Sequence, residues 1–252
     1  MKTTGWFTVF ARARASRWAT GAAVAAAVVA ASAPLRAVES VNVGATSIIV
    51  RTVTGEIEEK VRHLVVKDSV YLNEVIATGA NSATEIDFLD GTKISLGPNV
   101  RMTLDKFVFD PEPGRSTFVM TATEGVLRFF SGNLEHSAYV IKTPTATIGI
   151  RGTIFTVVVL PDGTTAITLE QPSSCVYVAN LLGQIIKLCT PGTGTVVTPG
   201  GGMTPPGVPP AWVLALIEAL NNLLGFQQVN YEVIYNSAEN PCDAAASPNC
   251  NN

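Results

Sequence analysis

The fifteen residues TPTATIGIRGTIFTV, Thr143 to Val157, place a proline, two glycines and one arginine inside an otherwise apolar, β-branched run. This pattern predicts two short strands, Ala146–Ile150 and Thr153–Val158, joined by a tight corner at Arg151 and Gly152. Glycine tolerates the positive φ that such a corner needs. The five donors of the arginine can satisfy backbone carbonyls or a carboxylate. The stretch is therefore expected to be architectural, with Arg151 as a buried anchor whose replacement by alanine would cost roughly a few kcal/mol.

The same texture extends to both sides, from about residue 41 to residue 197. Short β-branched or alternating runs are separated by corners that contain Gly, Asp or Asn, and no helical pattern lies between them. The fold is therefore expected to be all-β, as a solenoid or roll-like stack of short strands, with a β-sandwich as the alternative. The expected strands are 47–52, 61–66, 69–77, 84–88, 93–96, 100–109, 116–121, 126–130, 138–142, 154–160, 165–169 and 193–198, together with a hairpin between Cys175 and Cys189.

A short echo recurs within these runs. Asp90-Gly91-Thr92, Arg151-Gly152-Thr153 and Asp162-Gly163-Thr164 each stand before an apolar strand. Glycine makes the turn, and threonine is the first β-branched residue of the next strand. The echo favours short strands stacked as successive rungs, each burying its apolar face against its neighbours.

The texture changes after Thr198. Residues 199–210, PGGGMTPPGVPP, predict a Pro/Gly linker. Residues 211–226 predict one amphipathic helix that packs back onto the β body, with membrane or partner docking as the alternative. Residues 229–235, VNYEVIY, predict a further strand that pairs with a sheet edge of this chain or of another molecule. The apolar stripe of the helix consists of Val213, Leu216, Ile217, Leu220, Leu223 and Leu224.

The N-terminus has the pattern of an export signal. A basic region without acids precedes the short apolar run Trp18–Ala33, which small residues close. That run falls short of the about 20 residues of a membrane-spanning helix, so cleavage after Ala37 is expected, with an uncleaved anchor as the alternative. The expected plan is a signal peptide at 1–37, an all-β domain at 38–198, the linker at 199–210, and a helix, strand and disulfide-tied tail at 211–252. In either case the rest of the chain is expected outside the cytoplasm, in the periplasm or secreted.

Charge and cysteine content narrow the possible partners. Residues 38–252 hold 12 basic and 20 acidic side chains, a net charge of −8, which argues against binding nucleic acid or an anionic membrane surface. Membrane association is expected only if the N-terminal segment stays uncleaved. The four cysteines are expected to form disulfides, because neither CxxC spacing nor a nearby histidine supports zinc. Of the three possible pairings, proximity in the sequence favours Cys175–Cys189 with Cys242–Cys250. In the first pair, Val176 would face Leu188 and the turn would fall at Leu181-Leu182-Gly183.

No pattern for catalysis or cofactor binding stands out. The sequence has no GxSxG, HExxH or Walker-type loop, and its two histidines, His63 and His136, are expected at the surface. Asp87 and Asp90 could suggest Ca²⁺ or an acid and base pair. Too few oxygen ligands lie nearby for calcium, so a turn at Asp90 is expected, and Asp87 is a possible partner of Arg151. We therefore predict no catalytic residue, no metal and no cofactor.

Four motifs together resemble the FecR domain of Gram-negative envelope proteins. They are Ile76-Ala77-Thr78-Gly79, then Asp90-Gly91-Thr92, then Gly125 to Phe129, and the closing signature Thr143-Pro144 to Arg151-Gly152-Thr153. The resemblance covers about residues 50–197. It implies a periplasmic, non-enzymatic, all-β domain, which in signalling members relays contact with a TonB-dependent receptor to a cytoplasmic sigma factor. Fewer than 20 residues precede the apolar run here, so a free-standing exported protein is expected.

Three functions are compatible with this resemblance. The first is a binding or scaffolding module that contacts an envelope protein or a cell-wall component. The second is a periplasmic sensory component of a TonB-receptor or stress signalling system whose cytoplasmic part lies on another polypeptide. The third is a carbohydrate-active enzyme, which would need two or three carboxylates on one face.

Overall fold

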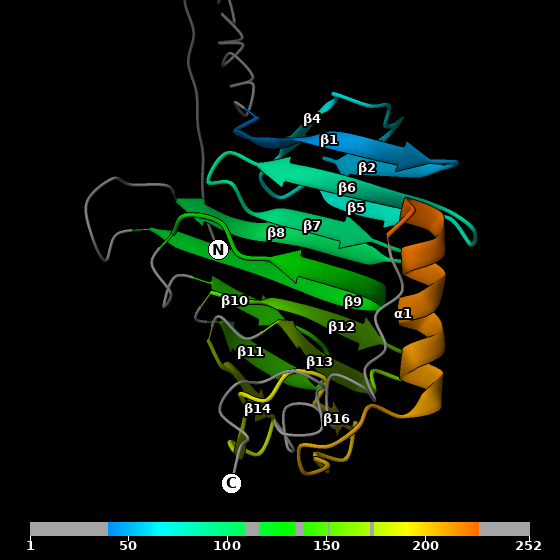
Figure 1. Cartoon of the computed structure of the whole chain (residues 1–252). Helices are drawn as coiled ribbons and strands as arrows, with labels where there is room; N and C mark the ends of the chain where they lie inside the picture. Colours follow the sequence, from blue (N-terminus) through cyan, green and yellow to red (C-terminus); the bar gives the residue numbers. More distant parts are fainter. Residues whose placement is uncertain (1–39, 109–115, 135–138, 151, 172–173, 227–252) are drawn as a thin grey trace, which may run out of the picture. The chain divides into compact units, whose positions relative to one another are not determined.

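The described part of the chain contains sixteen strands and one helix. Figure 1 shows their arrangement. The structure is a computed structural model that describes residues 40–108, 116–134, 139–150, 152–171 and 174–226. In chain order the elements are β1 (Asn42–Val50), β2 (Val53–Ile57), β3 (Lys60–His63), β4 (Ser69–Tyr71), β5 (Val75–Thr78), β6 (Ala83–Phe88), β7 (Lys93–Leu96), β8 (Arg101–Val108), β9 (Thr117–Phe130), β10 (Tyr139–Lys142), β11 (Ala146–Ile150), β12 (Ile154–Val159), β13 (Thr165–Gln171), β14 (Val176–Asn180), β15 (Ile185–Leu188), β16 (Gly194–Val197) and α1 (Ala211–Leu224).

The strands form two sheets that share β9. Sheet A has the order β4-β1-β6-β7-β9-β12-β13-β16. Sheet B has the order β3-β2-β5-β8-β9-β10-β11-β14-β15. Neighbouring strands are antiparallel except for β9 and β10, which are parallel. Both sheets therefore combine hairpins with pairs of strands that are not consecutive in the chain, and β9 is their common member.

The long strand β9 passes from one sheet to the other at Gly125. Its first half pairs with β8 and β10 in sheet B, and its second half pairs with β7 and β12 in sheet A. Gly125 has a φ of 96°, a conformation that L side chains rarely adopt. A Cβ atom at this position would lie 2.6 Å from Cα of Val100. The crossing therefore needs glycine both for its backbone angle and for the close approach of Val100, the residue before β8.

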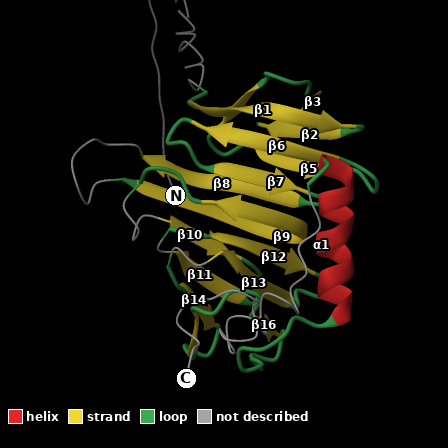
Figure 2. Ribbon diagram, in the orientation of Figure 1, coloured by secondary structure: helices red, strands yellow, loops and turns green. Residues whose placement is uncertain are grey.

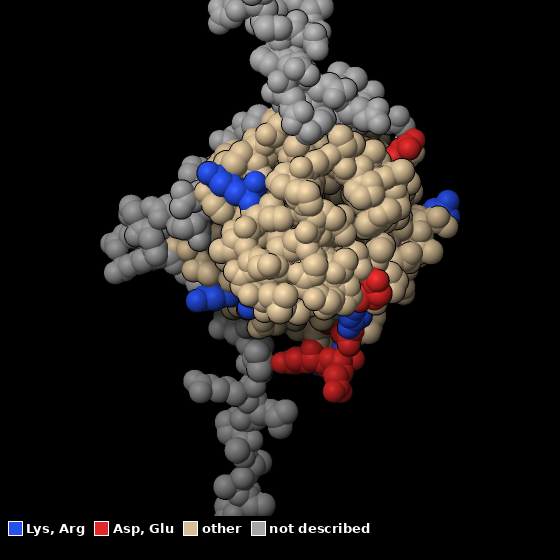
Figure 3. Space-filling model, turned by 90° about the horizontal axis from the view of Figure 1, so that it is seen from below, with Lys and Arg blue, Asp and Glu red and all other residues tan. Residues whose placement is uncertain are grey.

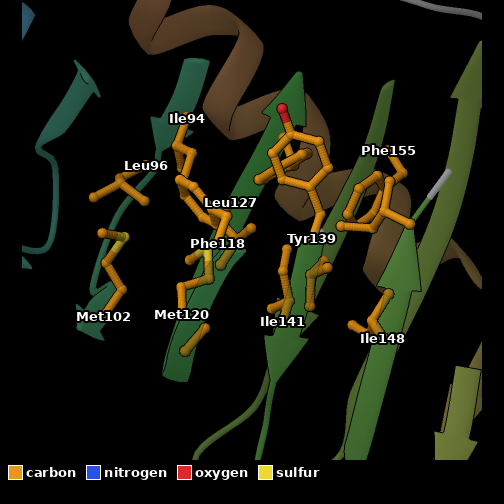
Figure 4. Packing of buried hydrophobic residues seen from close by; sticks show 14 of the residues in the cluster. Ile94, Leu96, Met102, Phe118, Met120, Leu127, Tyr139, Ile141, Ile148 and Phe155 are labelled. Carbon is orange, nitrogen blue, oxygen red and sulfur yellow. The ribbon is translucent and has the colours of Figure 1, made fainter. Parts of the chain in front are cut away.

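Aromatic and aliphatic side chains from both sheets form the main core (Figure 4). Phe118 of sheet B lies at its centre. Its ring centroid is 5.2 Å from Phe88 in sheet A and 5.8 Å from Phe129, further along β9. Edge-to-face pairs of this kind add to the free energy of burial. The alternation of apolar residues along β6, β7 and β9 is what places these side chains between the sheets.

Helix α1 covers the opposite face of sheet A and crosses its strands (Figure 2). Val213, Ile217 and Leu220 form a second apolar cluster with Val126, Val158 and Ala166 of sheet A. The helix ends at Gly225, whose φ of 73° is left-handed. The expected packing of the helix onto the β body is therefore confirmed. Within the described residues, no helix is both long and apolar enough to cross a membrane.

The all-β fold with a single C-terminal helix is confirmed. Its antiparallel pairing is that of the sandwich alternative, and the passage of β9 between sheets is its roll-like feature. The strands differ from the prediction in three places. Strand β2 was not expected. Residues 69–77 form two strands, β4 and β5, separated by a turn in which Asn73 has a φ of 64°, and residues 117–130 form one strand where two were expected. The segment 199–210 is not a free linker, because residues Met203 and Gly207 bridge to β16.

The cysteine hairpin agrees with its prediction. Cys175 and Cys189 form a disulfide, with Cα atoms 4.4 Å apart. Val176 pairs with Leu188, and Gly183 makes the turn with a φ of 77°. The predicted Cys242–Cys250 bridge, the signal peptide and the strand at 229–235 lie outside the described residues.

Candidate functional site

The Asp90-Gly91-Thr92 turn is a buried hydrogen-bonded network. Asp90 Oδ1 accepts a hydrogen bond from the backbone N–H of Thr92 at 3.0 Å, and its Oδ2 accepts one from Thr92 Oγ1 at 2.6 Å. The hydroxyl of Tyr139 on β10 donates to the same Oδ2 at 3.1 Å, and it accepts from the backbone N–H of Leu134 at 3.2 Å. The expected turn is therefore present, and it also joins sheet A to sheet B.

The third triplet repeats this geometry at the surface. Thr164 donates from its backbone N–H to Asp162 Oδ1 at 2.8 Å and from its hydroxyl to Asp162 Oδ2 at 2.9 Å. The two aspartates differ in burial, since Asp90 is 1% exposed and Asp162 lies at an exposed turn. The pair therefore separates the effect of the turn from the effect of burial.

We predict that Asp90→Asn lowers the free energy of unfolding by about 2 kcal/mol, and Asp162→Asn by no more than about 0.5 kcal/mol. Asparagine keeps one oxygen for the threonine N–H, but it turns the second acceptor into a donor. At Asp90 that donor would face two buried hydroxyl groups, whereas at Asp162 the surrounding water can accept its hydrogen bond. Urea denaturation of both variants measures the difference. Equal losses would show that burial of the carboxylate has no energetic role.

Burial raises the pKa of the Tyr139 phenol to about 12, and the charge of Asp90 acts in the same direction, while a hydrogen bond with Thr92 opposes the shift. The unfolded chain titrates this group near pH 10. The folded state therefore holds the neutral phenol more firmly, and this contribution is complete below about pH 10 and is lost as the pH rises through about 12.

We accordingly expect wild type to lose more stability than Tyr139→Phe between about pH 10 and pH 12. The phenylalanine variant starts lower at neutral pH because the N–H of Leu134 loses its acceptor. The measurement is the unfolding free energy of both proteins from pH 7 to pH 12. Lys93, whose pKa is raised by its hydrogen bond to Asp87, contributes equally to both curves. Parallel curves over the whole range would contradict the prediction.

The first residues of the closing signature form hydrogen bonds to β11 and to the turn at Gly163. The backbone N–H of Ala146 donates to Thr143 Oγ1 at 2.9 Å, and Thr145 Oγ1 donates to the carbonyl of Gly163 at 2.9 Å. Pro144 lies against Gly163, where an added Cβ atom would be 3.2 Å away. The hydroxyl groups of Thr143 and Thr145 are thus hydrogen-bonded to the backbone at this corner.

The corner after β11 has the backbone that the sequence predicts. Gly152 has a φ of 78°, and the hydroxyl of Thr153 donates to the carbonyl of Gln171. Arg151 lies outside the described residues, so its role as a buried anchor stays a prediction. Asp87, its suggested partner, forms an ion pair with Lys93 at 2.9 Å.

An ion pair that the sequence did not predict is buried on the face of sheet A that carries α1. Arg128 Nε donates to Glu170 Oε1 at 2.9 Å, and the hydroxyl of Thr156 donates to the same oxygen. The ring of Phe226 lies 5.3 Å from the Arg128 guanidinium. Arg128 and Glu170 are 4% and 7% exposed. The available signal was a charged residue directly beside large apolar residues, Leu127 and Phe129 in β9 and Leu169 in β13.

The remaining chemical candidates do not form a cluster. His63 is exposed on β3, and His136 lies outside the described residues. Within the residues that can be described, no group of three or more His, Cys, Asp or Glu side chains could hold a metal ion. Two hollows flank α1, one of about 200 Å³ between β13, β16 and residues 204–210, and one of about 150 Å³ beside Gly125. Apolar side chains line most of both, so neither offers an acid and base pair.

The turn between β14 and β15 presents the most exposed apolar side chains of the described chain. Leu181, Leu182 and Ile185 are 68%, 70% and 67% exposed. Figure 3 views the end of the domain that carries β14 and β16 in Figure 1, and charged side chains appear there mainly at the rim. This uncharged end surface is a candidate for contact with another macromolecule.

Taken together, the fold and these networks define an all-β domain whose polar motif residues hold its turns and sheets together. Residues 74–174 match the family model described as FecR protein, so this part of the chain is similar to a FecR domain. The search of curated proteins returned no match.

Two solved structures are similar in fold, and both are described as a "putative anti-sigma factor" from Parabacteroides distasonis ATCC 8503. One, at 2.50 Å resolution, is 18% identical with a TM-score of 0.42, and the match covers 52% of this chain and 57% of that chain. The other, at 1.65 Å, is 16% identical with a TM-score of 0.44, over 60% of this chain and 74% of that chain. The chain thus spans little more than half the length of the first.

Proposed function

We propose that this protein is a non-enzymatic binding or scaffolding module of the FecR type, which contacts an envelope protein or a cell-wall component. The observation that carries the proposal is that polar side chains of the domain bond to one another in its interior. Asp90, Thr92 and Tyr139 bond to one another in the interior, and so do Arg128 and Glu170. Groups that are buried and engaged in this way are not available to a substrate. The FecR domain match supports the same class.

A periplasmic or secreted location is part of this proposal. The basic and apolar pattern of residues 1–37 supports export. The Cys175–Cys189 disulfide also supports it, because such bonds persist in oxidising compartments.

Fractionation and crosslinking of intact cells test the proposal. We expect the tagged protein in the envelope fractions, crosslinked to one partner in near-equal amount. Gly149→Ala, a change on β11 with open space around it, serves as the folded control and should capture the same partner. The proposal fails if the protein stays in the cytoplasm, or if crosslinked cells yield no complex with another envelope component.

The FecR match also favours a second candidate, a sensory component of a TonB-receptor or stress signalling system. In that case the cytoplasmic part resides on another polypeptide. Deleting the gene should then change transcription of an iron-uptake or stress operon. An unchanged transcriptome under iron limitation and envelope stress would exclude this candidate and leave the scaffolding module standing.

A further inference from the structure

The two sheets have four edge strands, and three of them are protected against pairing with another chain. Exposed strand edges present unpaired backbone groups, and proteins commonly blunt them with charge, shortness or a covering segment. Strand β3 carries Lys60, Arg62 and His63 among its four residues. Strand β4 has only three residues, and residues 203 and 207 bridge to the edge of β16.

Strand β15 is less protected, because one of its four residues is charged and, among the described residues, no covering segment bridges to it. It pairs with β14, and among the described residues no strand pairs with its other side. Ile185 is 67% exposed, and Lys187 is the one charged residue of the strand. The Lys187 ammonium lies 5.6 Å from the ring centroid of Tyr177 on the neighbouring strand, which is a cation–π geometry. The charge is therefore drawn towards its own sheet.

The surroundings of β15 are also poor in charge. Residues 39–142 hold 24 Asp, Glu, Lys and Arg side chains, whereas residues 143–226 hold five. Glu170 is one of these five, and it is buried against Arg128. Leu181 and Leu182 extend the apolar surface of Ile185 around the hairpin turn. Figure 3 shows this nearly uncharged end of the domain.

The edge is also held in a fixed conformation. The Cys175–Cys189 disulfide ties the two strands together beyond the Val176–Leu188 pair. At the turn, Asn180 Oδ1 accepts hydrogen bonds from the backbone N–H of Leu182 at 3.0 Å and of Gln184 at 2.9 Å. Asn180 Nδ2 donates to the carbonyl of Gly201 at 2.6 Å. A pre-organised edge loses less conformational entropy when it pairs.

We propose that a second copy of this chain pairs with the free edge of β15, antiparallel about a two-fold axis, so that sheet B continues into its neighbour. The charge distribution selects a second copy as the occupant. Residues 38–252 carry a net charge of −8, so two copies repel each other over most of their surfaces. The β15 end is where that repulsion is smallest, and a two-fold contact requires the same patch on both subunits. This proposal does not depend on the proposed function.

Sedimentation equilibrium of the purified protein tests the proposal with a matched pair of variants. Ile185→Asp on β15 and Val61→Asp on β3 place the same charge on the two opposite edges of sheet B, at side chains that are 67% and 65% exposed. We expect wild type and Val61→Asp to dimerise reversibly with similar affinity. Ile185→Asp should weaken dimerisation about tenfold or more, because a carboxylate would replace an apolar side chain in a contact that excludes water. Leu182→Asp should weaken it in the same direction.

Amide hydrogen exchange identifies the contact as strand pairing. The amides of β15 should become more protected as the protein concentration rises, and those of β3 should not change. A wild type that stays monomeric at all concentrations would overturn the proposal. So would a dimer that Ile185→Asp leaves intact while the variant retains the wild-type melting temperature.

Discussion

Replacing Glu170 by glutamine is expected to lower the free energy of unfolding by about 3–5 kcal/mol, because the Arg128 guanidinium would stay buried without its counter-charge. The two side chains come from β9 and β13 and are 4% and 7% exposed. Glutamine has nearly the same shape, and its oxygen can still accept from Thr156. The loss therefore measures the charge rather than the packing.

The environment of the pair explains why the loss is large. Arg128 lies between Ser95 of β7 and Thr156 of β12 in the sheet register, and both neighbours are buried and uncharged. Arg128 Nη2 has no hydrogen-bond partner among the described residues. Glu170 Oε1, 2.9 Å from Arg128 Nε, is the carboxylate oxygen that compensates the guanidinium.

Two control variants test this explanation by urea denaturation. Arg128→Met combined with Glu170→Gln removes both charges and should recover most of the lost stability. Asp87→Asn breaks the exposed pair with Lys93 and should cost less than about 1 kcal/mol. If the double variant were as unstable as Glu170→Gln, burial of an unpaired charge would not be the cause.

The second large effect is expected at the crossing point of β9, where Gly125→Ala should cost about 3 kcal/mol or more. Two penalties add there. The backbone has a φ of 96°, and the new Cβ atom would lie 2.6 Å from Cα of Val100 and 2.8 Å from the carbonyl oxygen of Asn99. Backbone atoms cannot move aside as a flexible side chain can, so the relation between the two sheets must change.

Substitutions at two further glycines separate the penalty of the backbone angle from the penalty of the steric clash. Gly183→Ala has a φ of 77° but open space around the new Cβ atom, and it should cost about 1 kcal/mol. Gly149→Ala has neither penalty, and its effect should stay within about 0.5 kcal/mol. Thermal and urea unfolding of the three variants give the comparison. If Gly125→Ala lost no more stability than Gly183→Ala, the clash with Asn99 and Val100 would be relieved at little cost in free energy.

Local sequence patterns predicted much of the fold. The register of the cysteine hairpin followed from simple counting between Cys175 and Cys189, and the Asp90 turn followed from its Asp-Gly-Thr triplet. Strand β2 escaped prediction because Gly55 and Glu56 interrupt its apolar pattern. Strand β9 was divided because its middle, around Glu124 and Gly125, resembles a corner. It is a corner between two sheets, made without a break in the strand.

Some residues of the candidate sites could be identified from the sequence, and others could not. The motif residues Asp90 and Thr143 stood out in the sequence, and the structure assigns both of them to turns. Arg128 and Glu170 were not singled out, because nothing in the local sequence of either strand indicates that the two side chains meet. Their pairing depends on β9 and β13 both lying beside β12, which no local pattern encodes.

The sequence by itself determined the positions of most strands and turns, because alternation, β-branching and glycine act within a few residues of the chain. The TPTATIGIRGTIFTV stretch with which the fold was predicted forms β11, the turn at Gly152 and most of β12. Only the tertiary structure decided which strands are neighbours, and therefore that β11 and β12 belong to different sheets. Strand pairing joins residues far apart in the chain. It is selected by the burial of whole sheet faces, and that free energy exists only once both sheets have formed.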